Sequence, residues 1–385
     1  MTKTLKFKVE DVLPSLQMVS SIVLQKNTMP ILGNVLVRTQ NKGDKAYIIF
    51  MASDGDMWLC NRIFVQETML DDIAVCLDAK SLCASLGSLV GEEITLGVDE
   101  EKKTIKCKYS KGHFSMTYMD AEEFPQPYVN EDEVDGVFEI NSKSLNEGIK
   151  RCIYAVGNDA ISPIINGIHM QFLEEGGVEY AATNRKSLVM FKDNNVEKVV
   201  DKEGNLLDFT IPKKACGIIT NMLSGLDEVV KVKSSKQTST IGTKDIKLFV
   251  RMLEGNYPKY MAIVPKDNDK FAKVDREQLN QTLQRVISTG NNKEHLVLLN
   301  FNNGSVKVTC ENKEYSTIGE ETLPCELQGE PLDIAFNGLV FIDMLKNMDD
   351  DVINISLKEA KKPAILTQVP NDNKEYTLLL MPMRP

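Results

Sequence analysis

The segment Leu145-Asn-Glu-Gly-Ile-Lys-Arg-Cys-Ile-Tyr-Ala-Val156 carries a helical pattern of apolar residues. Its large apolar residues include positions 145, 149, 152 and 156, a spacing that places them on one face of an α-helix. Nearly the same spacing occurs twice more, at Val12, Leu16, Val19 and Val23 and at Leu279, Leu283, Val286 and Ile287. The sequence therefore predicts three amphipathic helices that each bury one face.

The three predicted helices recur at a nearly constant interval. Ile149 lies 133 residues after Leu16, and Leu283 lies 134 residues after Ile149. A weaker helical pattern follows each of them, at Leu82, Leu86 and Leu89, at Ile218 and Met222, and at Phe341, Leu345 and Met348. Each interval also ends in a large apolar residue before proline, at Phe124-Pro125, Tyr257-Pro258 and Met381-Pro382. Chance similarity among amphipathic helices is the alternative, but the shared register and endings favour three repeats.

Strand patterns separate the helices. Ile105, Cys107 and Tyr109 alternate with lysines. Ser110–Gly112 then has the composition of a turn, and the alternation resumes at Phe114, which predicts a half-buried hairpin. The predicted fold is therefore α+β, with three repeated domains that each pack two helices on antiparallel sheets. The predicted domains cover 1–128, 136–263 and 270–385, with polar linkers at Gln126–Gly136 and Pro265–Lys270.

The composition is that of a globular chain, since 42% of the 385 residues are hydrophobic and 26% are charged. No stretch approaches the roughly 18 consecutive apolar residues of a membrane-spanning helix, so no membrane association is expected. The start, Met1–Val9, has no apolar signal region, so no secretion is expected. Eight cysteines without a C-x-x-C pair indicate free thiols in a reducing cytoplasm rather than a disulfide framework.

The sequence lacks the motifs of common enzymes. It has three histidines and contains no H-E-x-x-H, no phosphate-binding loop, no strand-linked G-x-G-x-x-G and no G-x-S-x-G. No catalytic residue, metal site or cofactor is therefore predicted, and we expect a protein without enzymatic activity. Two other classes stay open at this point: a hydrolase with a paired-carboxylate site, and a β-rich scaffold that binds proteins but not DNA.

The charge of the chain is unevenly distributed. Its net charge of −10 argues against nucleic-acid binding, which usually requires a basic surface, but an acidic protein can still present one basic face. Basic residues gather on or beside the predicted helices, at Lys26, Lys80, Lys143, Lys150, Arg151, Lys213, Lys214, Arg276 and Arg285. Such residues could hold DNA by its phosphates alone, and phosphate contacts position a protein without reading the sequence. Ordinary solvated helix faces are the alternative.

Four parts of the sequence occur in the order of one known family: Met29–Val37, Ile165–Gly167 with Ala181–Thr183, Gly255–Pro265 and Met381–Arg384. Together with the threefold repeat, they make the chain resemble the bacterial DNA polymerase III β sliding clamp over nearly its whole length. The resemblance implies a head-to-tail homodimer that closes a ring around double-stranded DNA, with helices lining the hole. It also implies a processivity factor that tethers the replicative DNA polymerase in the cytoplasm.

The resemblance further implies a partner cleft between the second and third domains. There the replicative polymerase, the clamp loader and repair proteins would insert a short apolar motif. The implied cleft residues are Ile165, Thr183, Leu188, Pro258, Ile263, Leu379, Met381, Pro382 and Met383.

The chain departs from the usual pattern of the family in several places. It has Arg185-Lys186-Ser187 where the family often has Gly-His-Arg, and Ala262 where an arginine is usual. At the ring interface that the resemblance implies, Phe114 is retained, whereas Ser288 and Thr289 replace residues that are often apolar. These departures bear on the motif that partners carry and on the strength of ring closure.

Overall fold

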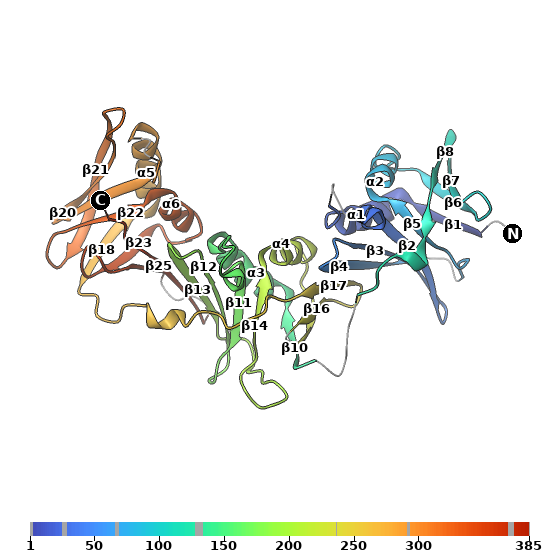
Figure 1. Cartoon of the computed structure of the whole chain (residues 1–385), viewed down its shortest axis with the longest axis horizontal. Helices are drawn as coiled ribbons and strands as arrows, with labels where there is room; N and C mark the ends of the chain where they lie inside the picture. Colours follow the sequence, from blue (N-terminus) through green and yellow to red (C-terminus); the bar gives the residue numbers. More distant parts are fainter. Residues whose placement is uncertain are drawn as a thin grey trace. The chain divides into compact units, whose positions relative to one another are not determined.

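The computed structural model describes residues 3–24, 29–65, 69–127, 134–235, 237–290, 293–368 and 373–384. Contacts within the chain divide it into two compact units, each built from two segments. Unit 1 comprises Met1–Lys143 and Gly217–Met252, and unit 2 comprises Ser144–Cys216 and Leu253–Pro385. Figure 1 colours both units along the sequence and labels helices and strands where there is room.

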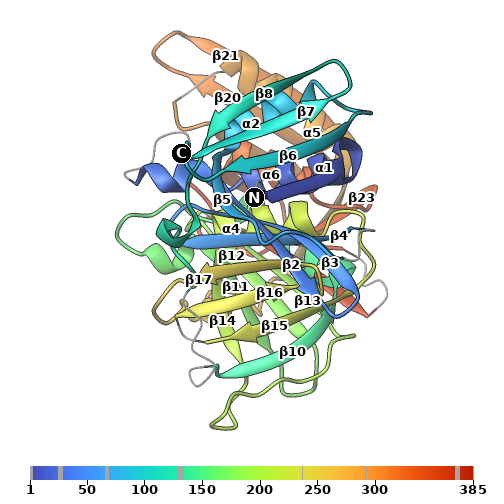
Figure 2. The ribbon, with the colours of Figure 1, turned by 90° about the vertical axis from the view of Figure 1, so that its right-hand side faces the viewer.

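The described residues of unit 1 form two antiparallel sheets. The four-stranded sheet has the spatial order β1 (Lys3–Lys8), β6 (Glu93–Asp99), β7 (Thr104–Tyr109) and β8 (Gly112–Thr117). The nine-stranded sheet has the order β10 (Gly136–Asn141), β15 (Val229–Ser234), β16 (Thr238–Gly242), β17 (Ile246–Arg251), β4 (Met57–Val65), β3 (Lys45–Ser53), β2 (Asn34–Lys42), β5 (Ala74–Asp78) and β9 (Met119–Asp120). Figure 2 shows the strands from β10 to β3 in succession. β7 and β8 form the predicted hairpin, with buried Cys107 paired to Phe114.

The helices α1 (Val9–Ser20) and α2 (Ala79–Gly87) of unit 1 pack against each other. α1 buries the predicted apolar positions Val12, Leu16 and Val19. It ends before the predicted Val23, whose N–H donates to the Ser20 carbonyl three residues back at 3.1 Å, in the tighter spacing that often closes a helix. The short 3-10 helices η1 (Pro30–Gly33) and η2 (Ala121–Glu123) also belong to this unit.

Unit 2 is built on one long antiparallel sheet. Its spatial order is β14 (Asp208–Pro212), β11 (Gly167–Phe172), β12 (Val178–Thr183), β13 (Ser187–Asp193), β25 (Lys374–Leu380), β24 (Ala364–Thr367), β23 (Val352–Leu357), β18 (Lys270–Asp275), β21 (Thr317–Gln328), β20 (Gly304–Asn312), β19 (Leu296–Asn302) and β22 (Leu332–Asn337). The pairing of β13 with β25 joins strands that lie far apart in the sequence.

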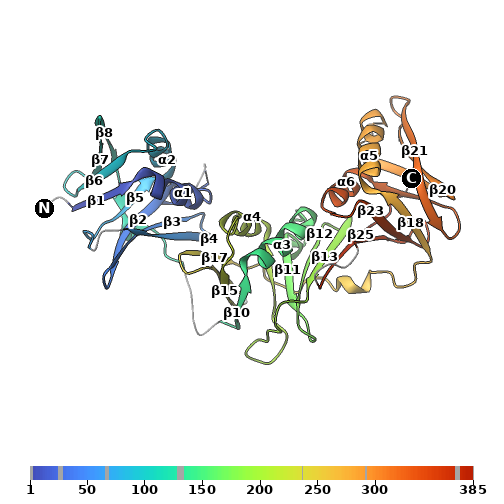
Figure 3. The same cartoon turned by 180° about the vertical axis from the view of Figure 1, so that it is seen from behind.

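The helices α5 (Arg276–Gly290) and α6 (Gly338–Lys346) of unit 2 lie against each other, as Figure 3 shows, and α5 packs on β20 and β21. The helices α3 (Ser142–Cys152) and α4 (Lys213–Met222) each start in one unit and end in the other. α3 ends before the predicted Val156 and continues as the 3-10 turn η4 (Ile153–Ala155). Two further 3-10 turns are η5 (Pro163–Ile165) and η6 (Tyr260–Ala262).

The structure confirms two helices in each predicted repeat, at α1 and α2, α3 and α4, and α5 and α6. The strands of the second repeat divide between the two units, because β10 and β15 to β17 pair into the sheet of unit 1 and β11 to β14 into that of unit 2. Each long sheet therefore runs from one repeat into the next. The boundaries 1–128, 136–263 and 270–385 stay a prediction.

Candidate functional sites

The apolar end of the chain joins a buried cluster in unit 2. β25 pairs antiparallel with β13, which places Leu379 directly opposite Leu188. One further bond extends this pairing past the strand, since the Met381 N–H donates to the Lys186 carbonyl at 2.9 Å. We call the surrounding residues the tail cluster: buried Ala181, Leu188, Met190, Tyr260 and Leu379, with Tyr257, Val264 and Met381 packed against them.

The tail cluster contains part of the predicted partner cleft. Leu188 and Leu379 are 0% exposed, so they support the surface from below rather than form it. Met381 is half-buried against the cluster, and Pro258 and Ile263 are exposed on either side of η6. The accessible apolar surface here is therefore supplied by the tail and by the segment around η6.

The other predicted cleft residues lie beside the cluster. Ile165 and Thr183 meet at Gly157, where an added Cβ atom would lie 3.2 Å from the carbonyl oxygens of both. Glycine at this position allows the close approach of the two segments. Pro382 is half-buried, and the Met383 N–H donates to a carbonyl of β22 at 2.7 Å. The tail is thus fastened at Met383 to the strands of the third repeat.

Two tyrosines of the cluster are absent from the predicted cleft. The Tyr260 hydroxyl donates to Glu179 at 2.5 Å, and the Tyr257 ring stacks on His169 with centroids 4.6 Å apart. Burial raises the pKa of Glu179. Burial also lowers the pKa of His169, although Asp208 lies 3.8 Å from its ring. The only sequence signal for these tyrosines is a spacing of three residues in a non-helical segment, which does not reveal that both rings are largely buried.

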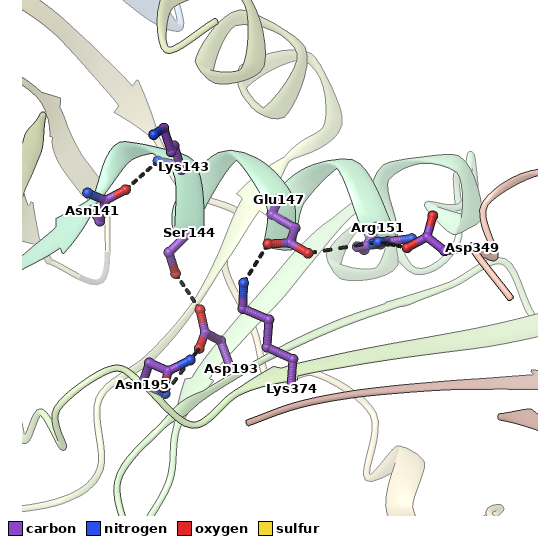
Figure 4. A network of polar contacts seen from close by, with 9 residues as sticks. All are labelled: Asn141, Lys143, Ser144, Glu147, Arg151, Asp193, Asn195, Asp349 and Lys374. Atoms are coloured by element: carbon purple, nitrogen blue, oxygen red, sulfur yellow. Dashed lines mark hydrogen bonds and ion pairs between the residues drawn. The ribbon is translucent and has the colours of Figure 1, made fainter. Parts of the chain in front are cut away.

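Arg151 of α3 is bound to the loop that follows α6 (Figure 4). Its guanidinium forms an ion pair with Asp349 and donates to the Asn347 carbonyl at 2.9 Å. The same group lies 5.3 Å from the ring centroid of Tyr376, within cation–π range. Its side chain is 21% exposed. The charge that was predicted to face DNA is therefore engaged within unit 2.

Two further contacts hold α3, as Figure 4 shows. The Lys374 ammonium at the start of β25 donates to Glu147 at 2.8 Å, and the Ser144 hydroxyl donates to Asp193 at 2.6 Å. Asp193 is 1% exposed and also accepts from the Asn195 amide. α3 is thereby fixed to both strands of the β13–β25 pair.

The two predicted DNA-facing arginines of α5 are also engaged. Arg276 donates to the carbonyls of Asp350 at 2.9 Å and Leu345 at 3.4 Å. Arg285 donates to both oxygens of Glu321 at 2.8 Å. The Arg285 guanidinium holds the pKa of Glu321 below its ordinary value. Both arginines therefore have structural partners in unit 2.

The predicted DNA-facing lysines differ from one another. Lys143 forms an ion pair with Asp227 at 2.5 Å, and the Lys213 ammonium donates to the Val156 carbonyl at 3.4 Å. Lys26 lies outside the described residues. Among the predicted lysines that the structure describes, the exposed ones are Lys80, Lys143, Lys150, Lys213 and Lys214.

The predicted interface residues lie beside strand edges. Phe114 is half-buried on β8, the last strand of the four-stranded sheet. Ser288 and Thr289 are exposed on α5, and Thr289 contacts β21 at Gly319, where an added Cβ would lie 3.0 Å from the Thr289 Cβ. In the part of the chain that the structure describes, Thr317–Cys325 of β21 pairs with β20 and with no second strand.

Among the described residues, no group of three or more histidine, cysteine, aspartate and glutamate side chains is arranged to hold a metal ion. No helix in the described part of the chain combines the length and the apolar character needed to cross a membrane. None of the eight cysteines, which all lie in the described part of the chain, forms a disulfide bond.

Three domain models of one protein family match the chain in order. They are the N-terminal, central and C-terminal domains of the DNA polymerase III beta subunit, matched at residues 4–128, 139–259 and 261–384. Among curated proteins, the beta sliding clamp of Halalkalibacterium halodurans is 27% identical over 374 residues, which cover 95% of each chain. That of Synechococcus elongatus is 26% identical over 376 residues, which cover 96% of each chain.

Solved structures share the fold over the whole chain. A clamp from Bartonella birtlesii, solved with griselimycin bound, gives a TM-score of 0.90 at 23% identity and covers 100% of both chains. The C. crescentus clamp, solved with polyethylene glycol at a proposed beta-motif tethering region, gives a TM-score of 0.87 at 20% identity and also covers 100% of both chains. The predicted α+β fold of three clamp domains is confirmed. The chain belongs to the family of DNA polymerase III beta subunits, the beta sliding clamps, which are processivity factors without catalytic activity of their own.

Proposed function

We propose that two copies of this chain close head to tail into a ring that encircles double-stranded DNA and tethers the replicative DNA polymerase to it. The observation that carries the proposal is the match of all three beta-subunit domains, in order, over nearly the whole chain. We assign the three clamp domains to 1–128, 136–263 and 270–385. We place the protein in the cytoplasm, where a bacterial chromosome is replicated.

Two strand edges support ring closure. β8 is the last strand of its sheet, and the part of β21 that pairs with β20 lacks a second neighbour among the described residues. Such edges present free N–H and C=O groups that can pair with another chain. Ile318, at the β21 edge, is 56% exposed, and Phe114 of β8 is half-buried. Because the two edges belong to different surfaces, copies would join head to tail, and a ring forms when the rotation closes.

Helix lysines support contact with DNA phosphates. Lys80, Lys150 and Lys214 are exposed on α2, α3 and α4. Phosphate contacts position DNA without reading its sequence, and each neutralised phosphate contributes about −0.9 to the salt dependence of binding. The net charge of −10 keeps these contacts weak, which suits a protein that stays on DNA because the ring is closed.

The tail cluster supports a docking site for a short apolar motif of the polymerase, the clamp loader and repair proteins. Met261 and Ile263 are 54% and 49% exposed, and Met381 and Pro382 are half-buried beside the cluster. Methionines make an adaptable apolar surface that several partners can use in turn. Relatives of the same fold hold griselimycin and, at a proposed beta-motif tethering region, polyethylene glycol.

Retention on circular DNA tests the ring. The protein is loaded onto nicked circular DNA with the clamp loader of the same organism, freed of unbound protein by gel filtration, and then treated with an enzyme that cuts the circle once. We expect the protein to remain on the circle and to leave after linearisation. Equal retention on both forms would indicate ordinary surface binding and would overturn the proposal. Sedimentation that shows only monomers at micromolar concentration would also contradict it.

A further inference from the structure

The turn between β12 and β13 carries an arginine where glycine would be less strained. Arg185 has a φ of 69°, in the left-handed region of the backbone. The Thr183 hydroxyl accepts its N–H at 3.2 Å, and the Asn184 side-chain oxygen accepts the next two N–H groups at 3.0 and 2.9 Å. Strained residues persist where their surroundings hold them, and they gather at functional sites.

The Arg185 side chain reaches across to the loop 157–166. Its Nη2 lies 2.9 Å from Asp159 Oδ2 and donates to Ser162 Oγ at 3.0 Å. The other oxygen of Asp159 accepts the N–H groups of Ile161 and Ser162 at 2.8 and 2.9 Å. The bonds from Ser162 and Ile161, and more weakly the Arg185 charge, hold the pKa of Asp159 below its ordinary value. The Asp159 carboxylate thus accepts N–H groups within the loop and also pairs with the arginine of the β12–β13 turn.

This loop carries one side of the proposed partner site. Within this loop, Ile165 is buried at 3% exposure, whereas Ile161 is 87% exposed. The turn that holds the loop also holds the tail, because the Lys186 carbonyl accepts the Met381 N–H at 2.9 Å. The β12–β13 turn therefore connects the two sides of the site.

We propose that Arg185 is a positioning residue for partner binding, because its contact with Asp159 fixes the loop 157–166 where an incoming apolar motif would pack. The inference rests on the proposed partner site. A loop that is already fixed loses less conformational freedom when a peptide binds, so the contact increases affinity without touching the peptide. The Arg185 side chain is 56% exposed, so direct pairing with a carboxylate of the peptide is the competing role.

Fluorescence anisotropy with a labelled synthetic peptide that carries one leucine and one phenylalanine as anchors separates the two roles. Arg185→Gly suits the left-handed backbone, so the chain should unfold at the same temperature or higher while the peptide Kd rises about tenfold. Asp159→Asn keeps an acceptor for the loop N–H groups but loses the charge, and it should also raise Kd. The double variant should bind no more weakly than the weaker single variant, because both changes remove the same contact.

Arg251→Ala is the matched control, since it breaks another exposed arginine–aspartate ion pair, that of Arg251 with Asp56 in unit 1, and Kd should stay within about twofold. Tighter binding by Asp159→Asn would overturn the inference, because a released Arg185 would then be pairing with the peptide. An unchanged Kd in both Arg185→Gly and Asp159→Asn would overturn it as well. If the unaltered chain does not bind the peptide, the proposed partner site fails, and the inference fails with it.

Discussion

Arg151 of α3 pairs with Asp349, which lies 198 residues further along the chain. The contact joins the first helix of the second repeat to the loop after the last helix of the third. Tyr376 of β25 completes the arrangement, since its hydroxyl donates to the Arg151 carbonyl at 2.8 Å while its ring lies beside the guanidinium. A residue that a helical wheel places on a solvated basic face is therefore part of the joint between two repeats.

Replacement of Arg151 should cost stability and leave DNA binding nearly unchanged. Arg151→Ala removes the donor to the Asn347 carbonyl and the partner of Asp349, so we expect the free energy of unfolding of unit 2 to fall by about 1–3 kcal/mol. Calorimetry would show this as a lower transition temperature. Lys150→Ala, at the exposed neighbouring position, should leave stability within about 0.5 kcal/mol and reduce the salt slope of DNA binding by about 0.9. A loss of stability in Lys150→Ala, or a smaller salt slope of DNA binding in Arg151→Ala, would contradict the roles given to these residues.

Two helix glycines should respond oppositely to alanine. A Cβ at Gly148 would lie 2.4 Å from the Tyr180 ring, which is 0% exposed and has no room to withdraw, so Gly148→Ala should destabilise by about 1–3 kcal/mol. At Gly217 of α4 no atom lies within 4 Å of the added Cβ, and Gly217→Ala should stabilise by up to about 1 kcal/mol. Urea midpoints that rank the two variants the other way would show that the helix packing is not as described.

The strength of ring closure should depend on the edge of β21. Ile318→Lys replaces an exposed apolar side chain at that edge with a charge, and it should raise the dimer Kd at least about tenfold. Val137→Lys is the matched control, because Val137 is 50% exposed on β10, the last strand of a different sheet. Sedimentation velocity over a dilution series measures the dimer Kd of both variants. Equal effects of the two variants would place the interface elsewhere.

The helices α1 to α6 were predictable because their signal is local. The buried positions of α1 and α5 include those that recur at helical spacing in the sequence. The helix ends were less predictable, since they depend on single contacts such as the bond from the Val23 N–H to the Ser20 carbonyl, the last of α1. Alternation also predicted the β7–β8 hairpin, whose strands are neighbours in the chain.

The pairing between repeats could not be predicted, because alternation shows which face of a strand is buried and not which strand lies beside it. β17 pairs with β4, and Leu188 pairs with Leu379, over long separations in the chain. The same limit applies to the site. Lys150 and Arg151 are adjacent and carry the same charge, but only the structure shows that Arg151 is engaged by residues of another repeat.

Acidification should weaken the fold through His169. The residue is 5% exposed, its ring stacks on Tyr257, and its Nδ1 lies 3.3 Å from the Thr210 hydroxyl. Because burial lowers the pKa of His169 below the ordinary 6.5, the unfolded chain binds a proton that the folded chain does not as the pH falls below about 6.5. The stability that neutral His169 gives the fold is therefore fully present above about pH 6.5. It is lost as the pH falls toward the pKa of the folded state, and the free energy of unfolding then decreases by at most about 1.4 kcal/mol per pH unit.

The test compares the unaltered chain with His169→Asn between pH 7.5 and 5 by urea unfolding. Glu179, whose pKa is raised by burial, shifts stability in the opposite direction over the acidic range, but it is present in both chains and cancels in their difference. We expect the stability advantage of the unaltered chain to shrink steadily below about pH 6.5. Parallel pH profiles for the two proteins would show that His169 takes up its proton equally in the folded and unfolded states.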